Sequence, residues 1–195
     1  MRDTANLLTP WNATHWAWIV FVCYWILSAR NLKRVAQKES LAARVPHILI
    51  VIAAYVLLLD RRLPLGFLNQ RATPRIEWLA WVGVAITCLG VAIAIWARVH
   101  IGQYWSGRIT LKEDHQLIRS GPYAYVRHPI YTGLLLAATG TAIANGLLRA
   151  WLGLLIILLL HFRKARKEEA LLSSKFGDAY REYHQRSGFL LPRFH

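Results

Sequence analysis

Apolar residues in this chain are gathered into five blocks, and this arrangement constrains the fold more than any other feature. The blocks lie at 13–29, 45–59, 76–97, 130–148 and 150–162. A soluble domain of 195 residues can bury a core, but its apolar residues alternate with polar ones by face. A helix needs ~20 apolar residues to cross a bilayer. The pattern therefore predicts an all-α integral membrane protein with about five transmembrane helices.

The last two blocks are expected to form a tight helical hairpin. Asn145-Gly146 stands between them and is a common turn signal. The second and fifth blocks are both short for a membrane span. No proline or glycine interrupts the chain from the end of the fifth block to Gly177, so we expect that helix to continue past the bilayer into the charged tail.

Lysine and arginine residues are divided unequally between the two predicted sides of the membrane. The segments 30–44, 98–128 and 163–195 hold 18 of them, and the remaining segments hold 6. Basic residues favour the cytoplasmic side, so we expect the N-terminus outside and the C-terminus in the cytoplasm. Four arginines in one loop fall on the opposite side in this scheme: Arg61, Arg62, Arg71 and Arg75.

The formal net charge of +14 raises the question of a polyanionic partner. The basic residues lie between and after the apolar blocks, which is typical of contacts with anionic lipid headgroups. We therefore expect membrane lipid, and no nucleic acid, among the partners. His115 and His128 stand at no recognised metal-ligand spacing, so no metal site is expected. Nothing in the sequence indicates an oligomeric state.

Small residues recur along the fourth block at spacings of four, three and four. They are Gly133, Ala137, Gly140 and Ala144. Such a stripe lets a neighbouring backbone approach closely, as membrane helices require. We expect Gly133 to let the fifth helix come close.

Two polar regions remain once the spans are set aside, and both fall on the predicted cytoplasmic side. One is the connector 98–128, and the other is the tail that begins HFRKARKEEALLSSKFGDAYREY. A hairpin of the last two blocks would bring the two regions together. Taken singly, tyrosine, arginine and histidine at a membrane edge are typical contacts of interface and lipid phosphate. The chain has no GxGxxG after a strand, no P-loop and no GxSxG, which excludes nucleotide-fold and hydrolase interpretations.

Five short motifs occur in order across these two regions. They are HQLI at 115–118, SGPY at 120–123, RHPIYTG at 127–133, KARKEE at 164–169 and FGDAY at 176–180. In combination they resemble the isoprenylcysteine carboxyl methyltransferase family, with its phospholipid methyltransferase relatives. The resemblance covers about residues 76–192.

This resemblance implies a membrane-embedded methyltransferase that uses S-adenosylmethionine in a cytoplasmic pocket. Its acceptor would be a lipophilic small molecule or a prenylated substrate. It implies one domain over 1–195, with an N-terminal helical hairpin at 1–75 and a catalytic core at 76–195. The residues implied to line the cofactor pocket are His115, Gln116, Leu117, Ile118, Tyr123, His128, Pro129, Ile130, Tyr131, Glu168 and Glu169.

The residues implied for catalysis are Lys164, Glu168 and Arg163. The family arginine that meets the substrate falls on Lys164, and Arg163 lies about 100° away around the helix. A guanidinium clamps a carboxylate with two hydrogen bonds, whereas an ammonium is a single-point donor. Carboxylate, thiol and amine acceptors therefore stay open. We expect the acceptor to reach the site between the third and fourth blocks.

Three alternatives stand beside this interpretation. The chain could methylate a lipid amine or a small thiol. It could be a membrane reductase of the sterol or isoprenoid type that uses a nicotinamide cofactor, a class that resembles this one in its C-terminal half. It could also be a non-catalytic membrane protein whose basic loops bind anionic lipid.

Overall fold

The computed structural model describes residues 9–29, 41–105 and 117–194, and within them the regular structure is helical. The long helices are α1 (Pro10–Ser28), α2 (Leu41–Leu59), α3 (Glu77–Ile101), α4 (Pro129–Asn145) and α5 (Leu148–Phe176), followed by the short α6 (Asp178–Arg186). Three 3-10 turns lie between them at Gly66–Asn69, Gly102–Tyr104 and Gly121–Ala124. In this part of the chain only two isolated bridges, Arg71 with Leu147 and Val126 with Gly188, pair segments as strands do.

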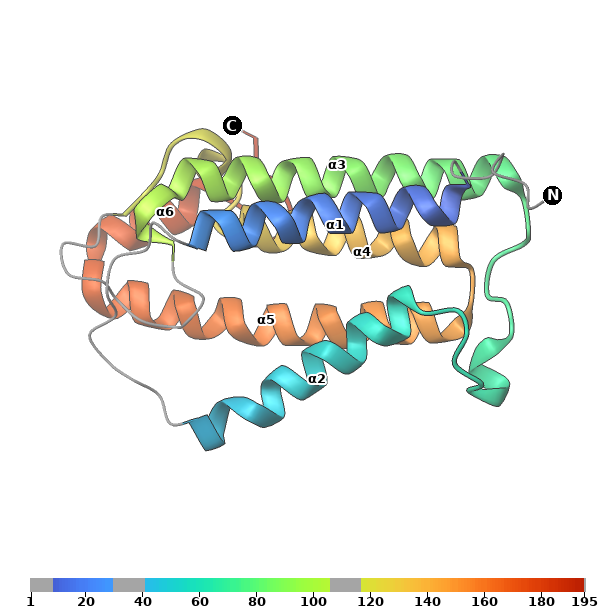
Figure 1. Cartoon of the computed structure of the whole chain (residues 1–195). Coiled ribbons are helices and arrows are strands. Elements are labelled where there is room, and N and C mark those ends of the chain that lie inside the picture. Colours follow the sequence, from blue (N-terminus) through green and yellow to red (C-terminus); the bar gives the residue numbers. More distant parts are fainter. Residues whose placement is uncertain (1–8, 30–40, 106–116, 195) are drawn as a thin grey trace.

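The five long helices run alternately in opposite directions along one bundle (Figure 1). α1, α3 and α4 lie together on one side, and α2 crosses α5 on the other (Figure 1). The alternation brings the ends of α1, α3 and α5 and the starts of α2 and α4 to the same end of the bundle. This end also carries α6, so it gathers the polar regions that the sequence placed on one side (Figure 1).

Apolar side chains cover much of the outer surface of the bundle. Within the described ranges, one helix is both long and apolar enough to cross a membrane, at Glu77–Tyr104, with a mean hydropathy of 2.2, and Val45–Leu59 is a shorter apolar helix. Only 33% of the most apolar stretch of the longer helix is buried, whereas a core helix of a soluble protein is mostly buried. Large side chains such as Ile26, Leu49 and Leu89 are more than half exposed.

The small-residue stripe of α4 packs against α3 and not against α5. A Cβ atom on Gly133 would lie 2.6 Å from both the Gly90 carbonyl oxygen and the Ala94 amide nitrogen. A Cβ on Gly83 would lie 2.6 Å from the Gly140 carbonyl oxygen. The predicted close packing is confirmed, but the expectation that Gly133 admits the fifth helix is wrong. The α3 backbone fills that space, because α3 carries matching glycines at the same heights.

The turn between α4 and α5 is confirmed at the predicted residues. Gly146 adopts a φ of 75°, which favours glycine, and its N–H donates to the Ala142 carbonyl at 2.8 Å. Arg61 Nη2 donates to the carbonyls of Ala144 and Asn145, both at 2.8 Å. A cation at a helix C-terminus interacts favourably with the negative end of the helix dipole. At least one of the four arginines on the unexpected side therefore has a local structural role.

α5 runs unbroken from Leu148 to Phe176, as the sequence predicted. Near its start it lies against α2, where a Cβ on Gly153 would be 2.6 Å from the Ala54 carbonyl oxygen. α5 therefore follows α4 in the chain but has its closest backbone approach with α2. α4 is likewise held most closely by α3.

Candidate active site

The connector enters α4 through a compact turn. Gly121 has a φ of 59° and opens a 3-10 turn, and Pro129 is the first residue of α4. A proline there removes an N–H that has no helical partner. Tyr123 is buried, and its carbonyl accepts a hydrogen bond of 2.7 Å from Tyr183 Oη of α6. The turn is thereby fixed to the tail of the chain.

Glu168 of α5 meets two residues of the predicted site at the start of α4. Tyr131 Oη donates to Glu168 Oε1 at 2.7 Å, and His128 Nδ1 lies 3.7 Å from Glu168 Oε2. The rings of His128 and Tyr131 are stacked, with centroids 5.6 Å apart. Burial raises the pKa of the Glu168 carboxyl, and Lys164, His128 and the Tyr131 hydroxyl oppose that rise. The structure thus brings the RHPIYTG and KARKEE motifs into direct contact.

The neighbouring Glu169 has a different environment. Arg127 Nε donates to its Oε1 at 2.6 Å, and both side chains are less than a tenth exposed. Burial alone would raise the pKa of Glu169, but the contacts of His128 and Arg127 outweigh it and lower the pKa to about 2. Arg127 Nη1 also donates to the carbonyls of His184, at 3.1 Å, and Ser187. Arg127 and Glu169 therefore anchor the C-terminal tail to α5.

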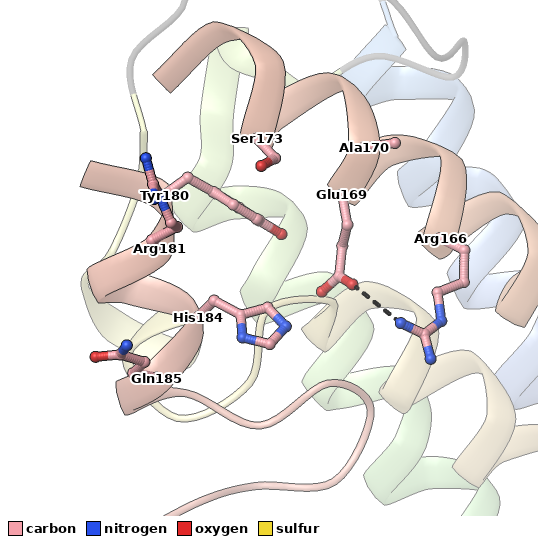
Figure 2. A pocket seen from close by; sticks show the side chains of 8 residues that line it. All are labelled: Arg166, Glu169, Ala170, Ser173, Tyr180, Arg181, His184 and Gln185. Carbon is pink, nitrogen blue, oxygen red and sulfur yellow. Dashed lines mark ion pairs between the residues drawn. The ribbon is translucent and has the colours of Figure 1, made fainter. Parts of the chain in front are cut away.

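A polar pocket of about 480 Å³ lies on the outer side of Glu169, between α5 and α6. Figure 2 shows that Tyr180 and His184 reach it from α6, while Glu169 and Arg166 reach it from α5. Arg166 Nη1 lies 3.9 Å from Glu169 Oε2, the ion pair that is dashed in Figure 2. Among the described members of the implied cofactor set, Glu169 alone lines this pocket.

An apolar cavity of about 510 Å³ opens on the other side of the site. α1, α2, α4 and α5 all contribute to its walls, with aromatic residues such as Trp18, Trp25 and Tyr55. Tyr131 and Lys164 are among its polar lining residues. The expected access between the third and fourth blocks is wrong, because α3 and α4 touch through their backbones. The open space lies on the opposite side of α4.

Lys164 and Arg163 point to different surroundings. Lys164 is half-buried, lines the apolar cavity and has its Nζ 5.7 Å from the centroid of the Tyr131 ring. Arg163 is exposed. Of the two neighbouring cations, Lys164 is therefore the one that the fold directs to the site.

The other residues of the implied cofactor set divide into three groups. Ile130 lines the apolar cavity, and Pro129 is buried beside it in the chain. Leu117 and Ile118 are half-buried, and Ile118 packs against the apolar core. His115 and Gln116 lie outside the described residues.

Two residues at this site were given no role from sequence. Arg127 belongs to the RHP triplet. A cation directly before a predicted membrane helix is the sequence feature that could have identified it. His161 stood at the end of an apolar block and gave no signal of its own. In the structure its ring lines the cavity and meets the Tyr131 ring edge-on, with centroids 5.0 Å apart.

The fold matches a known class of membrane enzymes. The structure of the eukaryotic intramembrane Ras methyltransferase ICMT (isoprenylcysteine carboxyl methyltransferase) is similar, with a TM-score of 0.59 and 24% sequence identity. The match covers 80% of this chain and 54% of that chain. The profile of the isoprenylcysteine carboxyl methyltransferase family matches residues 82–174. This match and the relatives below confirm the resemblance to that family over this segment.

Several relatives are named as methyltransferases, and others are named as metal-resistance proteins, such as the cobalt-zinc-cadmium resistance protein CzcN of Cupriavidus metallidurans. The protein-S-isoprenylcysteine O-methyltransferase of Schizosaccharomyces pombe is 38% identical over 102 residues, which are 51% of this chain and 43% of that protein. Methanethiol S-methyltransferase 1 of Bradyrhizobium diazoefficiens is 31% identical over 157 residues, which are 72% of this chain and 54% of that protein. The matches thus span about half the length of these relatives.

Proposed function

We propose that this chain is an integral-membrane methyltransferase that uses S-adenosylmethionine and acts on a lipophilic acceptor. The observation that carries the proposal is that a polar cluster adjoins an apolar cavity. A hydrogen-bonded polar cluster around Glu168 and an apolar cavity of about 510 Å³ share Tyr131, and Lys164 lies between them. A polar methyl donor and a lipophilic acceptor need this combination in order to meet.

The residues of the polar cluster suit S-adenosylmethionine. Within the described residues, His128 Nε2 is buried, lies 3.6 Å from Glu169 Oε1 and forms no hydrogen bond, so it could bond to a ligand that enters the cluster. The Glu168 carboxylate can pair with the positive charge of a sulfonium or with an amino group. His128, Tyr131 and Glu168 would hold the polar end of the donor, and the backbone of 117–118 would lie along it. When bound, S-adenosylmethionine supplies an electrophilic methyl group.

The apolar cavity would hold the acceptor. Its volume falls within the range of small-molecule sites, and its aromatic walls suit an apolar chain. Lys164 would orient the polar end of the acceptor next to Tyr131. The relatives named as protein-S-isoprenylcysteine and methanethiol methyltransferases support carboxylate and thiol acceptors alike.

The site would face the cytoplasm from a chain that crosses the bilayer several times. Exposed apolar side chains on most of the long helices support a lipid-facing surface. The bundle end that carries the site also holds the described parts of the segments with the excess of lysine and arginine. Residues 1–195 form one domain in this proposal, and 76–195 carry the catalytic core.

Calorimetry on the purified protein tests the cofactor. Binding of S-adenosylmethionine and S-adenosylhomocysteine without binding of NADPH is the expected result. Binding of NADPH alone would replace the proposal with a reductase, and binding of neither would leave a lipid-binding protein. Mass spectrometry of a lipid extract incubated with the protein and methyl-labelled S-adenosylmethionine then identifies the acceptor.

A further inference from the structure

Three polar residues of α5 form a stripe from the apolar cavity to the polar cluster. His161, Lys164 and Glu168 are spaced by three and four residues, which places them on one helical face. Tyr131 of α4 faces all three. Its ring lies edge-on to His161 at 5.0 Å and 5.7 Å from Lys164 Nζ, and its hydroxyl donates to Glu168 at 2.7 Å. His161 is the member of the stripe that lies within the predicted apolar block 150–162.

The hydrogen bond of His161 defines its tautomer. His161 Nδ1 lies 2.8 Å from the carbonyl oxygen of Ile157, one turn earlier in α5. A carbonyl only accepts, so Nδ1 must be the donor. In the neutral ring the proton is then on Nδ1, and Nε2 carries a lone pair. The ring lines the cavity, so the bundle holds a proton acceptor in the cavity wall.

We propose that His161 accepts the proton of the methyl acceptor, and that this acceptor is therefore a lipophilic thiol. The inference rests on the proposed function and adds a catalytic residue to it. A carboxylate carries no proton at neutral pH, and its oxygens would oppose the Nε2 lone pair. A thiol donates its S–H to Nε2 and needs a base, because the thiolate is the nucleophile.

The step balances with the groups named. The S–H bond breaks and its proton moves to His161 Nε2. The sulfur electron pair forms the new S–CH₃ bond while the bond between the methyl carbon and the donor sulfonium breaks, and that electron pair stays on the donor sulfur. The products are a thioether and S-adenosylhomocysteine, and His161 later releases its proton to water. Lys164 stabilises the thiolate charge that develops in the cavity.

The first test needs no methyl donor. Binding of 1-dodecanethiol is followed by quenching of tryptophan fluorescence, since Trp18, Trp25 and Trp105 line the cavity. His161→Phe keeps an aromatic ring against Tyr131 and removes the acceptor. It is expected to weaken dodecanethiol binding about threefold to tenfold, the loss of one hydrogen bond. Binding of dodecyl methyl sulfide, which has no S–H, is expected to stay unchanged.

His15→Phe is the matched protein control. His15 Nδ1 makes the same bond to the carbonyl four residues earlier, at 2.8 Å from Trp11, but its ring does not line the cavity. This variant is expected to bind dodecanethiol like the wild type. Equal binding of the thiol by the wild type and His161→Phe would overturn the contact between His161 and the acceptor.

The second test uses thiols of different acidity with the full chain in lipid nanodiscs. His161→Phe is expected to lower kcat/KM for 1-dodecanethiol about 100-fold, the usual contribution of a general base. For a 4-alkylbenzenethiol, which ionises at lower pH, the loss should stay below about fivefold, because less proton transfer is needed. The titratable groups that share the cavity with His161 are His47, Tyr55, Tyr131 and Lys164.

The possible outcomes separate the inference from the proposed function. Equal fractional losses for both thiols, with S-adenosylhomocysteine binding intact, would overturn only the role of His161. Methylation of dodecanoate but not of dodecanethiol by the wild type would overturn the thiol acceptor and the role of His161 together, and the proposed function would stand. Failure of the wild type to bind S-adenosylhomocysteine would overturn the proposed function and the inference together.

Discussion

The two sides of α4 are built in opposite ways. Towards α3 it presents glycine and alanine, and the backbones touch at Gly133 and Gly90. There Thr87 and Thr141 are also buried, with their hydroxyls 3.2 Å apart. Towards α5 it presents Tyr131 and Leu134, which face a cavity.

The difference separates stability from function. Close backbone packing gives many van der Waals contacts, which hold membrane helices together where lipid is as apolar as the side chains. A site that admits a ligand needs space, and space forfeits those contacts. The α3 side therefore fixes α4, and the α5 side is left open for chemistry.

Gly90→Leu is expected to have the largest effect, because it forces the closed side open. Its Cβ would lie 2.5 Å from the Gly133 carbonyl oxygen, so the helices must separate. We expect the free energy of unfolding to fall by about 3 kcal/mol, measured by thermal unfolding in detergent. Ala92→Leu, on an exposed face of the same helix, is the control. Similar stability of the two variants would contradict the closed packing.

Arg127→Met tests the anchor at the entrance to the open side. Removal of the guanidinium leaves Glu169 buried without its main partner, which should cost about 3 kcal/mol of unfolding free energy. Arg119→Met removes an exposed pair with Glu182, at 3.7 Å, and should cost less than about 1 kcal/mol. If both variants lose the same unfolding free energy in chemical or thermal unfolding, burial of the Arg127 pair does not increase its contribution to stability.

The same anchor predicts an acid dependence. The pKa of Glu169 in the folded chain is about 2, below its usual value of 4.5, so its contribution to stability is present above pH 4.5. That contribution should be lost as the pH falls from 4.5 towards 2. Across this pH range the unfolding temperature of Glu169→Gln should fall less steeply than that of the wild type. Parallel curves would assign the acid sensitivity to other groups.

Glu168→Gln tests the open side without disturbing the closed one. Gln can still accept from Tyr131, so we expect little change in unfolding temperature. The lost charge should weaken S-adenosylhomocysteine binding about tenfold, measured by calorimetry. Unchanged affinity would remove Glu168 from the cofactor site and confine it to packing.

Lys164→Met is expected to have the smallest effect of this series. Because Lys164 lines the cavity, its loss should raise the KM for the acceptor about fivefold. Arg163→Met should leave that KM unchanged, since Arg163 is exposed. The reverse pattern, read from methylation rates at varied acceptor concentration, would mean that the helix presents a different face to the substrate.

Much of the fold was predictable because its signals are local. Blocks of apolar residues mark helices, Asn145-Gly146 marks a turn, and Pro129 marks a helix start. The contact between His128, Tyr131 and Glu168 was predictable too, because a hairpin of known length returns the chain to the same end. Glu169 was assigned to the cofactor by its place in a motif, whereas its main partner in the structure is Arg127.

The sequence by itself determined which segments are helical, which residues are small enough for close packing, and which family the chain resembles. Only the tertiary structure decided that the small stripe of α4 meets α3, that the cavity lies among α1, α2, α4 and α5, and that His161 lines it. A glycine stripe accepts any neighbour with a complementary surface, so the partner depends on how all five helices pack at once. The position of a cavity depends on the same choice, because empty space is what the packed helices leave over.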